Sequence, residues 1–308
     1  MAGVPVRGGR FLVTGGSGFI GSHLCDLLIR RGADSLAVFD AKIREENLRE
    51  ALASGLVSVI EGNILDSETL GRASEGVDGV FHLATRSLPE CASDPRGGLE
   101  TNVLGTLKVA EVAEEAGARK LVFSSASSVY GDSAVDLDED SPLRPTSVYG
   151  ATKAAAELVL RAYHEQRGLD YVSLRYMNVY GPRQDGGLVA TTLRCVATGE
   201  PPLVAGDGTQ ELDFVHVQDV AAANLAAMEH TAANEVFNVG SGTGAVVGDI
   251  VAMLIELTGS ALQPVFGTGE APVARRVGSI RKAKELLEWH PKWDLGSGLR
   301  QLVGETAP

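Results

Sequence analysis

Apolar and polar positions along the first 180 residues follow a repeating order of short apolar runs and longer amphipathic segments. The apolar runs predict six strands: RFLVTGG, SLAVFD, VSVIEGN, GVFHLA, KLVFSS and YVSLRY. Between most of them, segments rich in Ala, Leu and Glu predict helices, among them 21–31, 102–116 and 149–167. Strands that alternate with helices are typical of a parallel sheet covered on both faces. The pattern therefore predicts an α/β fold with a doubly wound parallel sheet.

The pattern becomes irregular after residue 180. Gly and Pro clusters follow at YGPRQDGG, GEPP, AGDGTQ, VGSGTG and FGTGEAP. Such clusters indicate turns and loops. We therefore predict a large domain at 1–180 and a smaller C-terminal, substrate-binding portion at 181–308, with segments that return to the main sheet.

The charge of the chain limits its partners. The 308 residues carry a formal net charge of −13. Nucleic acid and anionic lipid surfaces are bound mainly by clustered Lys and Arg, so we expect neither a nucleic acid nor a membrane as partner. An anionic small molecule would need local arginines.

Cysteine usage and the N-terminus bear on the compartment. Cys25, Cys91 and Cys195 lie far apart and lack metal-ligand spacing, which predicts a reducing compartment without disulfides. The segment MAGVPVRGGR has no apolar stretch of the signal-peptide kind, and nowhere do eighteen apolar residues run together. We therefore expect a cytoplasmic protein.

A glycine-rich turn directly follows the first predicted strand. In FLVTGGSGFIGSHL, Gly16, Gly18 and Gly21 have G-x-G-x-x-G spacing, and Gly15, Gly18 and Gly21 have G-x-x-G-x-x-G spacing. Glycines between a strand and a helix permit a tight turn and the close approach of a pyrophosphate to the helix N-terminus. The turn therefore predicts a dinucleotide site on a Rossmann-type sheet.

Asp40 indicates which dinucleotide is bound. It follows Gly21 by nineteen residues, at the end of the second predicted strand. A carboxylate there accepts hydrogen bonds from both ribose hydroxyls of NAD and repels a 2′-phosphate. Lys42 and Arg44 would soften this preference. We expect NAD rather than NADP.

Tyr149 and Lys153 form a Y-x-x-x-K pair at the start of a predicted helix. Residues four apart lie on the same helical face, so the Lys153 ammonium can lie beside the phenol and lower its pKa from about 10. The pair therefore predicts a proton shuttle.

These features together resemble the extended short-chain dehydrogenase/reductase family, in particular its NAD-dependent nucleotide-sugar epimerases and dehydratases. Further segments carry the resemblance over nearly the whole chain: GNILD, HLAT, ETNVLGTL, SSASSVYG, RYMNVYGPRQ, GDGTQELDFVHVQDVA and FNVGSG. The resemblance implies that bound NAD oxidises a sugar at C4 while the tyrosine takes the hydroxyl proton, which gives a 4-keto intermediate.

The resemblance also implies a set of residues around the cofactor. They are Gly15, Gly18, Phe19, Ile20, Gly21, Asp40, Lys42, Asn63, Ile64, Leu83, Ala84, Thr85, Asn102, Ser124, Tyr149, Lys153, Tyr176 and Val179.

Two positions before VYG bear on the reaction. Dehydratases of the family carry Asp and Glu there and decarboxylases usually keep the Glu, whereas this chain has Ser127 and Ser128. A serine hydroxyl is a poor proton donor near neutral pH. We therefore expect 4-epimerisation of a UDP-sugar, with UDP-glucuronate decarboxylation or 4,6-dehydration of a nucleotide sugar as the alternative.

Ala126 departs from the family pattern, which has Ser or Thr at this position to hydrogen-bond O4 of the sugar. Three explanations stay open: Ser125 or Ser127 serves instead, Tyr149 works unaided, or the alanine is a deliberate substitution that traps substrate. A non-catalytic protein that binds NAD and a nucleotide sugar is a further alternative.

The family binds the diphosphate of the substrate with arginines of the C-terminal portion. Leu212 stands where an arginine usually precedes Asp213, so we expect Arg275 and Arg276 to make this contact. The other expected substrate residues are Ser87, Ser125, Ser127, Asn178, Val189, Arg194, Leu203 and Val204.

The sequence leaves the sugar open. Glu90 stands where many family members have arginine and would discourage a carboxylated sugar if it pointed inward. The serine-rich stretch resembles that of uronate 4-epimerases, and Arg194 would pair with a C6 carboxylate. UDP-glucuronate and UDP-glucose or its N-acetyl form are therefore both candidates.

The remaining expectations concern metal and assembly. His82 and His216 lack a third ligand at suitable spacing, so we expect no metal, and we expect His82 at a strand end beside the cofactor. Family members often pair through two long helices, here 102–116 and 150–167, which predicts a homodimer.

Overall fold

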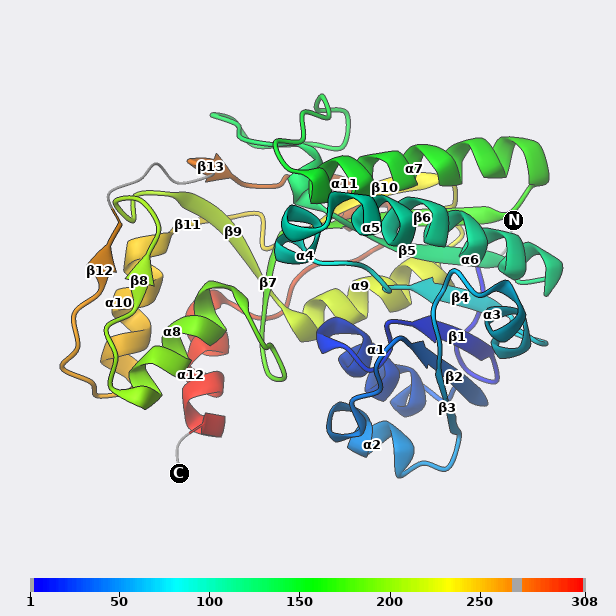
Figure 1. The fold of residues 1–308 in the computed structure, drawn as a ribbon, viewed down its shortest axis with the longest axis horizontal. Coiled ribbons are helices and arrows are strands. Elements are labelled where there is room, and N and C mark those ends of the chain that lie inside the picture. Colours follow the sequence, from blue (N-terminus) through cyan, green and yellow to red (C-terminus); the bar gives the residue numbers. More distant parts are fainter. Residues whose placement is uncertain (1–2, 268–272, 307–308) are drawn as a thin grey trace.

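The computed structural model describes residues 3–267 and 273–306 and contains a seven-stranded sheet with a smaller part beside it (Figure 1). The strand order is β10-β6-β5-β4-β1-β2-β3, and every neighbouring pair is parallel. The strands are β1 (Arg10–Thr14), β2 (Ser35–Asp40), β3 (Val57–Glu61), β4 (Gly79–His82), β5 (Lys120–Ala126), β6 (Asp170–Tyr176) and β10 (Glu235–Val239). The predicted doubly wound parallel sheet is confirmed.

Helices cover both faces of this sheet. One face carries α1 (Phe19–Arg30), α2 (Arg49–Leu52) and α9 (Val217–Glu229), and the other carries α3 (Ser67–Ala73), α6 (Gly105–Glu115) and α7 (Val148–Arg167). Phe11 and Val13 of β1 belong to the first core cluster, and Leu12 belongs to the second. This alternation follows from the two-residue period of a strand and explains why the buried strands read as continuous apolar runs.

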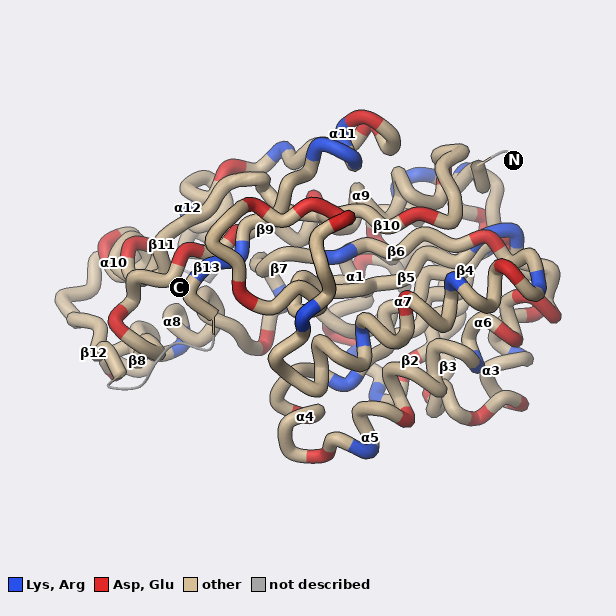
Figure 2. The backbone as a smooth tube through the Cα atoms, turned by 90° about the horizontal axis from the view of Figure 1, so that it is seen from above, with Lys and Arg blue, Asp and Glu red and all other residues tan. Residues whose placement is uncertain are grey.

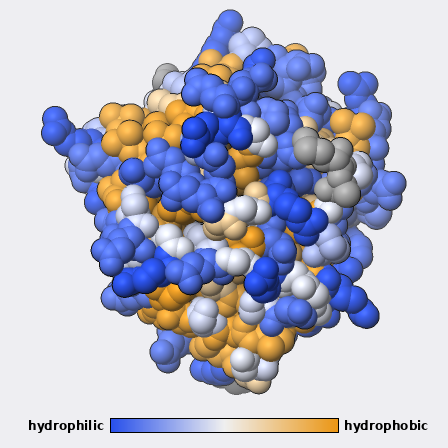
Figure 3. All heavy atoms as spheres, turned by 90° about the vertical axis from the view of Figure 1, so that its right-hand side faces the viewer, coloured by the Kyte–Doolittle hydropathy of each residue, from blue (hydrophilic) through white to orange (hydrophobic). Residues whose placement is uncertain are grey.

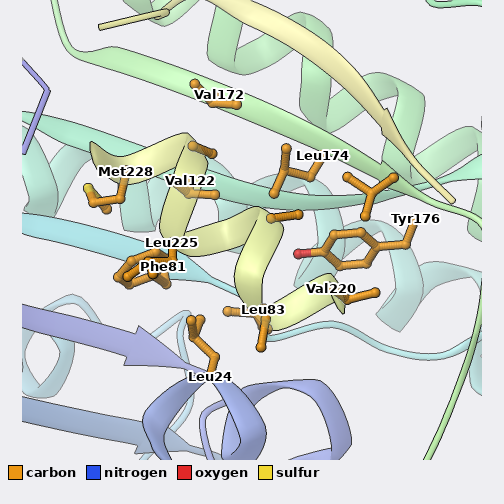
Figure 4. Close-up of a cluster of buried hydrophobic side chains, with 14 of the residues drawn as sticks. Leu24, Phe81, Leu83, Val122, Val172, Leu174, Tyr176, Val220, Leu225 and Met228 are labelled. Carbon is orange, nitrogen blue, oxygen red and sulfur yellow. The ribbon is translucent and has the colours of Figure 1, made fainter. Parts of the chain in front are cut away.

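Figure 4 shows the first of these clusters. Leu24 of α1, Phe81 of β4 and Leu225 and Met228 of α9 pack together in the buried core. All four side chains are at most 5% exposed. The apolar faces of two helices that lie nearly 200 residues apart in the sequence therefore share one core against the sheet.

The chain order reverses between β1 and β4. The sheet grows outward from β1 to β2 and β3 on one side, and from β4 to β5, β6 and β10 on the other. Such a switch point opens a crevice at the carboxyl ends of the two central strands. Gly15 follows β1 and Leu83 follows β4, so both lie at this crevice.

The smaller part comes mainly from residues after 176. Its elements are β7 (Asn178–Tyr180), α8 (Gly187–Thr198), β8 (Leu203–Val204), β9 (Glu211–His216), β11 (Gly244–Val246), α10 (Val247–Leu257), β12 (Val265–Phe266), β13 (Arg275–Arg276) and α12 (Leu295–Thr306). Strand β9 lies between β11 and β13 and also pairs with β7. Because β10 joins the main sheet, the chain returns from the smaller part to that sheet after residue 180. The division into domains at 180/181 stays a prediction.

The connecting segments include several short helices. They are η1 (Glu45–Leu48), α4 (Leu88–Ser93), α5 (Pro95–Leu99), the π-helical turn η2 (Glu100–Leu104), the short turn η3 (Ser127–Val129) and α11 (Arg281–Leu286). Of these, α4, α5 and η2 lie between β4 and α6, along the front of α7 (Figure 1).

Figures 2 and 3 show the charged residues along the backbone and the side chains at one end of the molecule. Figure 2 shows Lys and Arg scattered among Asp and Glu along the backbone. On the end of the molecule seen in Figure 3, apolar side chains lie between hydrophilic ones. Among the helices of the described residues, none is long and apolar enough to span a bilayer.

Candidate active site

A cleft of about 740 Å³ lies at the crevice between β1 and β4. Most of the predicted cofactor residues line it: Gly15, Gly18, Phe19, Ile20, Gly21, Asp40, Lys42, Asn63, Ile64, Leu83, Ala84, Thr85, Ser124, Tyr149, Lys153 and Tyr176. Ser87 and Ser125, from the predicted substrate set, line it as well. The parallel topology explains this convergence, because the carboxyl ends of the strands meet at one edge.

The glycine turn between β1 and α1 leaves no room for side chains. Gly15 has a φ of +67°, which favours glycine, and a Cβ there would lie 2.6 Å from the amide nitrogen of Ala84. A Cβ on Gly21 would collide with the carbonyl oxygen of Gly15. The bare backbone therefore forms a cradle at the N-terminus of α1, which fits the pyrophosphate of a dinucleotide.

Asp40 is fixed at the end of β2. Its Oδ2 accepts hydrogen bonds from the Ser17 amide at 3.1 Å and the Ser17 hydroxyl at 2.8 Å. The Lys42 amide donates to Oδ1 at 3.4 Å. The carboxylate thus stands beside the glycine turn, where the adenosine ribose of NAD would lie.

Helix α7 places Tyr149 and Lys153 at the inner end of the cleft. The helix begins at Val148 because Ser147 caps it, accepting a hydrogen bond from the Gly150 amide at 3.1 Å. Tyr149 therefore lies in the first turn and Lys153 one turn further along the same face. The Lys153 ammonium donates to the carbonyl oxygen of Ser124 at 2.8 Å and lies 5.8 Å from the centroid of the Tyr149 ring.

The electrostatics of this pair differ from the sequence-based expectation. Burial raises the pKa of the Tyr149 phenol, and burial lowers the pKa of Lys153 to about 7. The expected depression of the phenol pKa by the neighbouring lysine is therefore absent in the protein alone. Desolvation is the largest cause of both pKa shifts, because a charged form loses its hydration in a buried site.

Tyr176 closes the inner wall from β6. Its hydroxyl lies 2.9 Å from the Ser124 hydroxyl and also bonds the amide side chain of Asn224 on α9. These bonds fix Ser124, whose carbonyl holds Lys153. The strand end, α7 and α9 are therefore coupled directly at the site.

The serine-rich end of β5 does not supply an obvious replacement for the missing hydroxyl at Ala126. Ser125 is buried, and its hydroxyl donates to Glu157 Oε1 at 2.5 Å. Glu157 forms a buried ion pair with Arg175, Oε2 to Nη2 at 2.7 Å. The Ser125 hydroxyl thus directs its proton toward Glu157, and its catalytic role stays a prediction.

The two serines that follow Ala126 lie in η3. Both are buried, and the Ser128 hydroxyl has no hydrogen-bond partner among the described residues. Neither Ser127 nor Ala126 lines the cleft as the structure stands. Their catalytic roles stay predictions.

His82 lies at the end of β4, as expected, but behind the cleft wall. Its Nδ1 lies 2.7 Å from the Thr14 hydroxyl and its Nε2 3.0 Å from the Thr106 hydroxyl. Burial lowers the pKa of His82 to about 3, so the ring is neutral. In the parts of the chain that the structure describes, no three His, Cys, Asp or Glu side chains form a metal-binding group.

The segment after β4 forms the outer wall of the cleft. Asn102 does not line the cleft; its side chain instead accepts from the Arg86 amide at 2.7 Å and the Thr85 hydroxyl at 3.0 Å, and so shapes this wall from behind. Val179, in β7, is also outside the cleft lining. Ser87 and Glu90, at the start of α4, face the cleft.

The predicted substrate residues after position 180 are dispersed. Val189 and Arg194 of α8 line a second cavity of about 830 Å³, between α8 and the ends of α10 and α12. Leu203 is 71% exposed, whereas Val204 is buried in the small core between α8 and α10. The structure therefore does not bring these four residues to the first cleft.

The two predicted diphosphate arginines differ in their partners. Arg275 forms ion pairs with Glu211 at 2.8 Å and Asp136 at 2.5 Å, so its charge is neutralised. Arg276 donates to the Gly131 carbonyl at 3.0 Å and has no carboxylate within ion-pair distance among the described residues. Burial lowers the pKa of Arg276. Of the two, Arg276 is the one left to meet an anion.

The side chain of Asn178 forms a hydrogen bond within the protein. Its side-chain amide donates to the Asp213 carbonyl at 2.9 Å, joining β7 to β9. Asp213 in turn accepts from Ser241 and Gly242, which ties the smaller part together. The expected contact of Asn178 with substrate stays a prediction.

Sequence reasoning missed several residues of the cleft wall. They are Ser17, Ala41, Gly62, Arg86 and Thr101. Three of them stand inside segments that were already informative: GGSGFIG, GNILD and ETNVLGTL. Ala41 and Arg86 directly follow predicted residues, so extending each motif by one position would have found them.

The fold and the cleft define a dinucleotide-dependent enzyme of the short-chain dehydrogenase/reductase class. The profile of the NAD dependent epimerase/dehydratase family matches residues 11–240, and the chain belongs to this family. The predicted family and the predicted cofactor, NAD, are thereby confirmed.

Named relatives support the same assignment. The UDP-glucose 4-epimerase of Mycolicibacterium smegmatis is 34% identical over 310 residues, covering 96% of this chain and 97% of that protein. The UDP-glucuronate 4-epimerase of Thermodesulfobacterium geofontis is 31% identical over 312 residues, covering 96% and 95%. The solved structure of Thermotoga maritima UDP-glucose 4-epimerase with UDP-glucose has a TM-score of 0.90 at 37% identity, covering 96% and 97%.

Proposed function

We propose that the protein is an NAD-dependent isomerase that inverts C4 of a UDP-sugar. One observation carries the proposal: Tyr149 and Lys153 stand at the inner end of a cleft whose outer end holds the glycine cradle and Asp40. A single ligand that spans the cleft would bring its reactive end to the phenol. The named relatives that act on UDP-sugars support the choice of substrate.

The residues of the cleft fit NAD. Gly15 and Gly21 would hold the pyrophosphate, and Asp40 would accept from the ribose hydroxyls of the adenosine. Lys153 would meet the other ribose beside Tyr149. NAD, when bound, supplies the reversible oxidation at C4 of the sugar.

Tyr149 would take and return the proton of the C4 hydroxyl. Because burial raises the pKa of its phenol, the site needs added positive charge to favour the phenolate. The ammonium of Lys153 is one turn away and supplies that charge when it is protonated. The two groups therefore act as one proton-transfer unit.

One feature favours epimerisation over the alternatives that pass through the same 4-keto intermediate. Positions 127 and 128 carry serines, and no carboxylate of Asp or Glu stands there to protonate a leaving hydroxide. A hydroxyl is a weak acid near neutral pH. Elimination and decarboxylation therefore lack the acid that the dehydratases of the family have.

The surface of α5, η2 and α7 supports a homodimer. Leu99, Leu104 and Leu158 are 52%, 54% and 60% exposed, and their three elements pack against one another. Burial of such side chains against a second copy would remove apolar surface from water. Light scattering of wild type and Leu158→Glu should give a dimer and a monomer; a monomeric wild type would refute this part.

We further propose that the enzyme works in the cytoplasm on a small-molecule substrate, without nucleic acid. The dispersed Lys and Arg in Figure 2 support the absence of a nucleic-acid partner, because a surface that binds nucleic acid needs clustered cations.

A product assay tests the proposed function. The purified protein would be incubated with NAD and a panel of UDP-sugars, and the products separated by chromatography. We expect an equilibrium mixture of C4 epimers without net NADH. NAD binding without inversion of any sugar would instead favour the non-catalytic alternative, whose main support is Ala126.

A further inference from the structure

The first turn of α4 presents one carboxylate to the cleft. Glu90 lines the cleft together with Ser87, Tyr149 and Lys153. A capping box holds it there: the Ser87 amide donates to Glu90 Oε2 at 2.7 Å, and the Ser87 hydroxyl donates to the same oxygen at 2.5 Å. The side chain is therefore fixed in place before any ligand binds.

Glu90 keeps its negative charge. The hydrogen bonds from Ser87 favour the ionised form and lower the pKa of the carboxyl. The capping bonds occupy only Oε2, and no hydrogen bond to Oε1 is formed among the described residues. A side chain that lines the cleft beside Tyr149 thus carries a negative charge and one oxygen without a hydrogen-bond partner among the described residues.

Two arginines also line the cleft, and each forms an ion pair with a carboxylate of the protein. Arg86 forms an ion pair with Asp94, and Arg44 pairs with Asp185 at 2.8 Å. At the inner end, the Lys153 ammonium donates to the backbone of Ser124. Arg86 and Arg44 also lie near enough to Glu90 to help lower the pKa of its carboxyl, but their ion pairs are formed with Asp94 and Asp185.

Two of the arginines that the sequence analysis expected to meet the substrate lie elsewhere. Arg194 lines the second cavity and donates to the backbone oxygen of Asp185. Arg275 is paired with Glu211 and Asp136. Neither lines the cleft that contains Tyr149.

We propose that Glu90 is a specificity-determining residue that restricts the enzyme to UDP-hexoses without a charge at C6. This rests on the proposed function and names its substrate class. A C6 carboxylate would meet a fixed like charge, and the arginines of the cleft wall would have to leave Asp94 or Asp185 to compensate for it. A neutral hydroxyl or hydroxymethyl group can instead donate to the free oxygen of Glu90. Specificity of this kind comes from repulsion of the wrong ligand.

The test compares UDP-glucose with UDP-glucuronate as substrates of the NAD-loaded enzyme. Wild type should prefer UDP-glucose in kcat/KM by about 10²-fold. Glu90→Gln keeps one oxygen for the Ser87 amide and replaces the charged, free oxygen by a neutral NH2 donor. It should therefore reduce the ratio of the two kcat/KM values about tenfold. Glu68→Gln, on exposed α3 and paired with Arg72, is the matched control and should leave the preference unchanged.

Salt provides a second readout that a purely structural role would not move. Salt screens the repulsion between partly exposed charges. The wild-type preference for UDP-glucose should therefore fall about two- to threefold between 0.05 and 0.5 M NaCl. The preference of Glu90→Gln should change less. An equal or greater wild-type rate with UDP-glucuronate, or an unchanged preference in Glu90→Gln, would overturn the proposal.

Failure of the proposed function gives a different result. If no sugar is inverted, the proposed isomerase activity is wrong, and calorimetry with both UDP-sugars then tests Glu90 by binding alone. In that case Glu90→Gln should still bind UDP-glucuronate more tightly relative to UDP-glucose. The ratio of the Kd for UDP-glucuronate to the Kd for UDP-glucose should fall about tenfold. An unchanged ratio would refute the role of Glu90.

Discussion

The two halves of the ligand site are built in different ways. The cofactor half consists of strand ends and one glycine turn that the parallel sheet brings to a single edge. Most residues predicted for the sugar-nucleotide half lie in the smaller part, where Arg275 is already paired and Arg194 faces another cavity. Recognition of the coenzyme is thus a property of the backbone topology, whereas recognition of the sugar depends on a few side chains and their pairing.

Because of this difference, we expect the residues that carry the reaction and the residue that selects the substrate to lie in different parts of the site. Tyr149 and Lys153 belong to the rigid half, since α7 is capped by Ser147 and packed in the main core. Glu90 belongs to a short helix at the outer wall. Substitutions in the first region should change turnover or folding, and substitutions in the second should change the choice of substrate.

The strongest test of the rigid half removes the phenol hydroxyl. Tyr149→Phe should lower kcat about 10³-fold, because loss of a positioned acid–base group commonly costs 10²- to 10⁴-fold, while NAD remains bound. Tyr163→Phe, on the same helix but bonded to Glu114, is the matched control. A Tyr149→Phe variant with near wild-type turnover would show that another group moves the proton.

The buried ion pair behind the cleft should matter for stability. Glu157→Gln leaves Arg175 buried without a full counter-charge, so the free energy of unfolding should fall by about 3 kcal/mol. Glu50→Gln, which breaks an exposed pair with Arg30, should cost less than about 1 kcal/mol. Chemical denaturation measures both, and equal losses would contradict the role of burial.

A substitution that adds one methyl group at Gly21 tests the glycine cradle. Gly21→Ala places a Cβ against the Gly15 carbonyl and should weaken NAD binding about 10²-fold by displacing the turn. Gly71→Ala, in α3, meets nothing within 4 Å and serves as control. Calorimetric titration with NAD gives both constants. Unaltered affinity in Gly21→Ala would mean that the coenzyme binds elsewhere.

The smallest expected effect concerns Ala126. Ala126→Ser would restore the hydroxyl that the family has at this position and should raise kcat about tenfold if the reaction lacks a proton relay. Ser128→Ala, which removes a hydroxyl with no partner among the described residues, should leave kcat within twofold. No gain in Ala126→Ser would indicate that Tyr149 works unaided or that a neighbouring serine already serves.

Much of the rigid half could be predicted from the sequence. Gly15 to Gly21, Asp40 and the Tyr149/Lys153 pair have fixed spacings on a regular strand–turn–helix framework, and only Asn102 and Val179 of the predicted cofactor residues lie off the cleft. Local spacing determines local geometry there.

The sugar-nucleotide half could not be predicted as well. The pairing of Arg275 with Glu211 and Asp136 joins residues 64 and 139 positions apart, which no local spacing reveals. The same holds for the bond between Ser125 and Glu157, which removes a hydroxyl that the sequence offered as a substitute for Ala126. The raised pKa of Tyr149 depends on burial, which only the packed structure defines.

The central claim is tested most directly by following UDP-glucose in the presence of the purified enzyme and NAD by proton NMR. The account predicts that the signals of the C4 epimer grow to a constant ratio in wild type, and that this growth is about 10³-fold slower in Tyr149→Phe. Retention of UDP-glucose alone by the NAD-loaded wild type, or equal rates in both proteins, would contradict it.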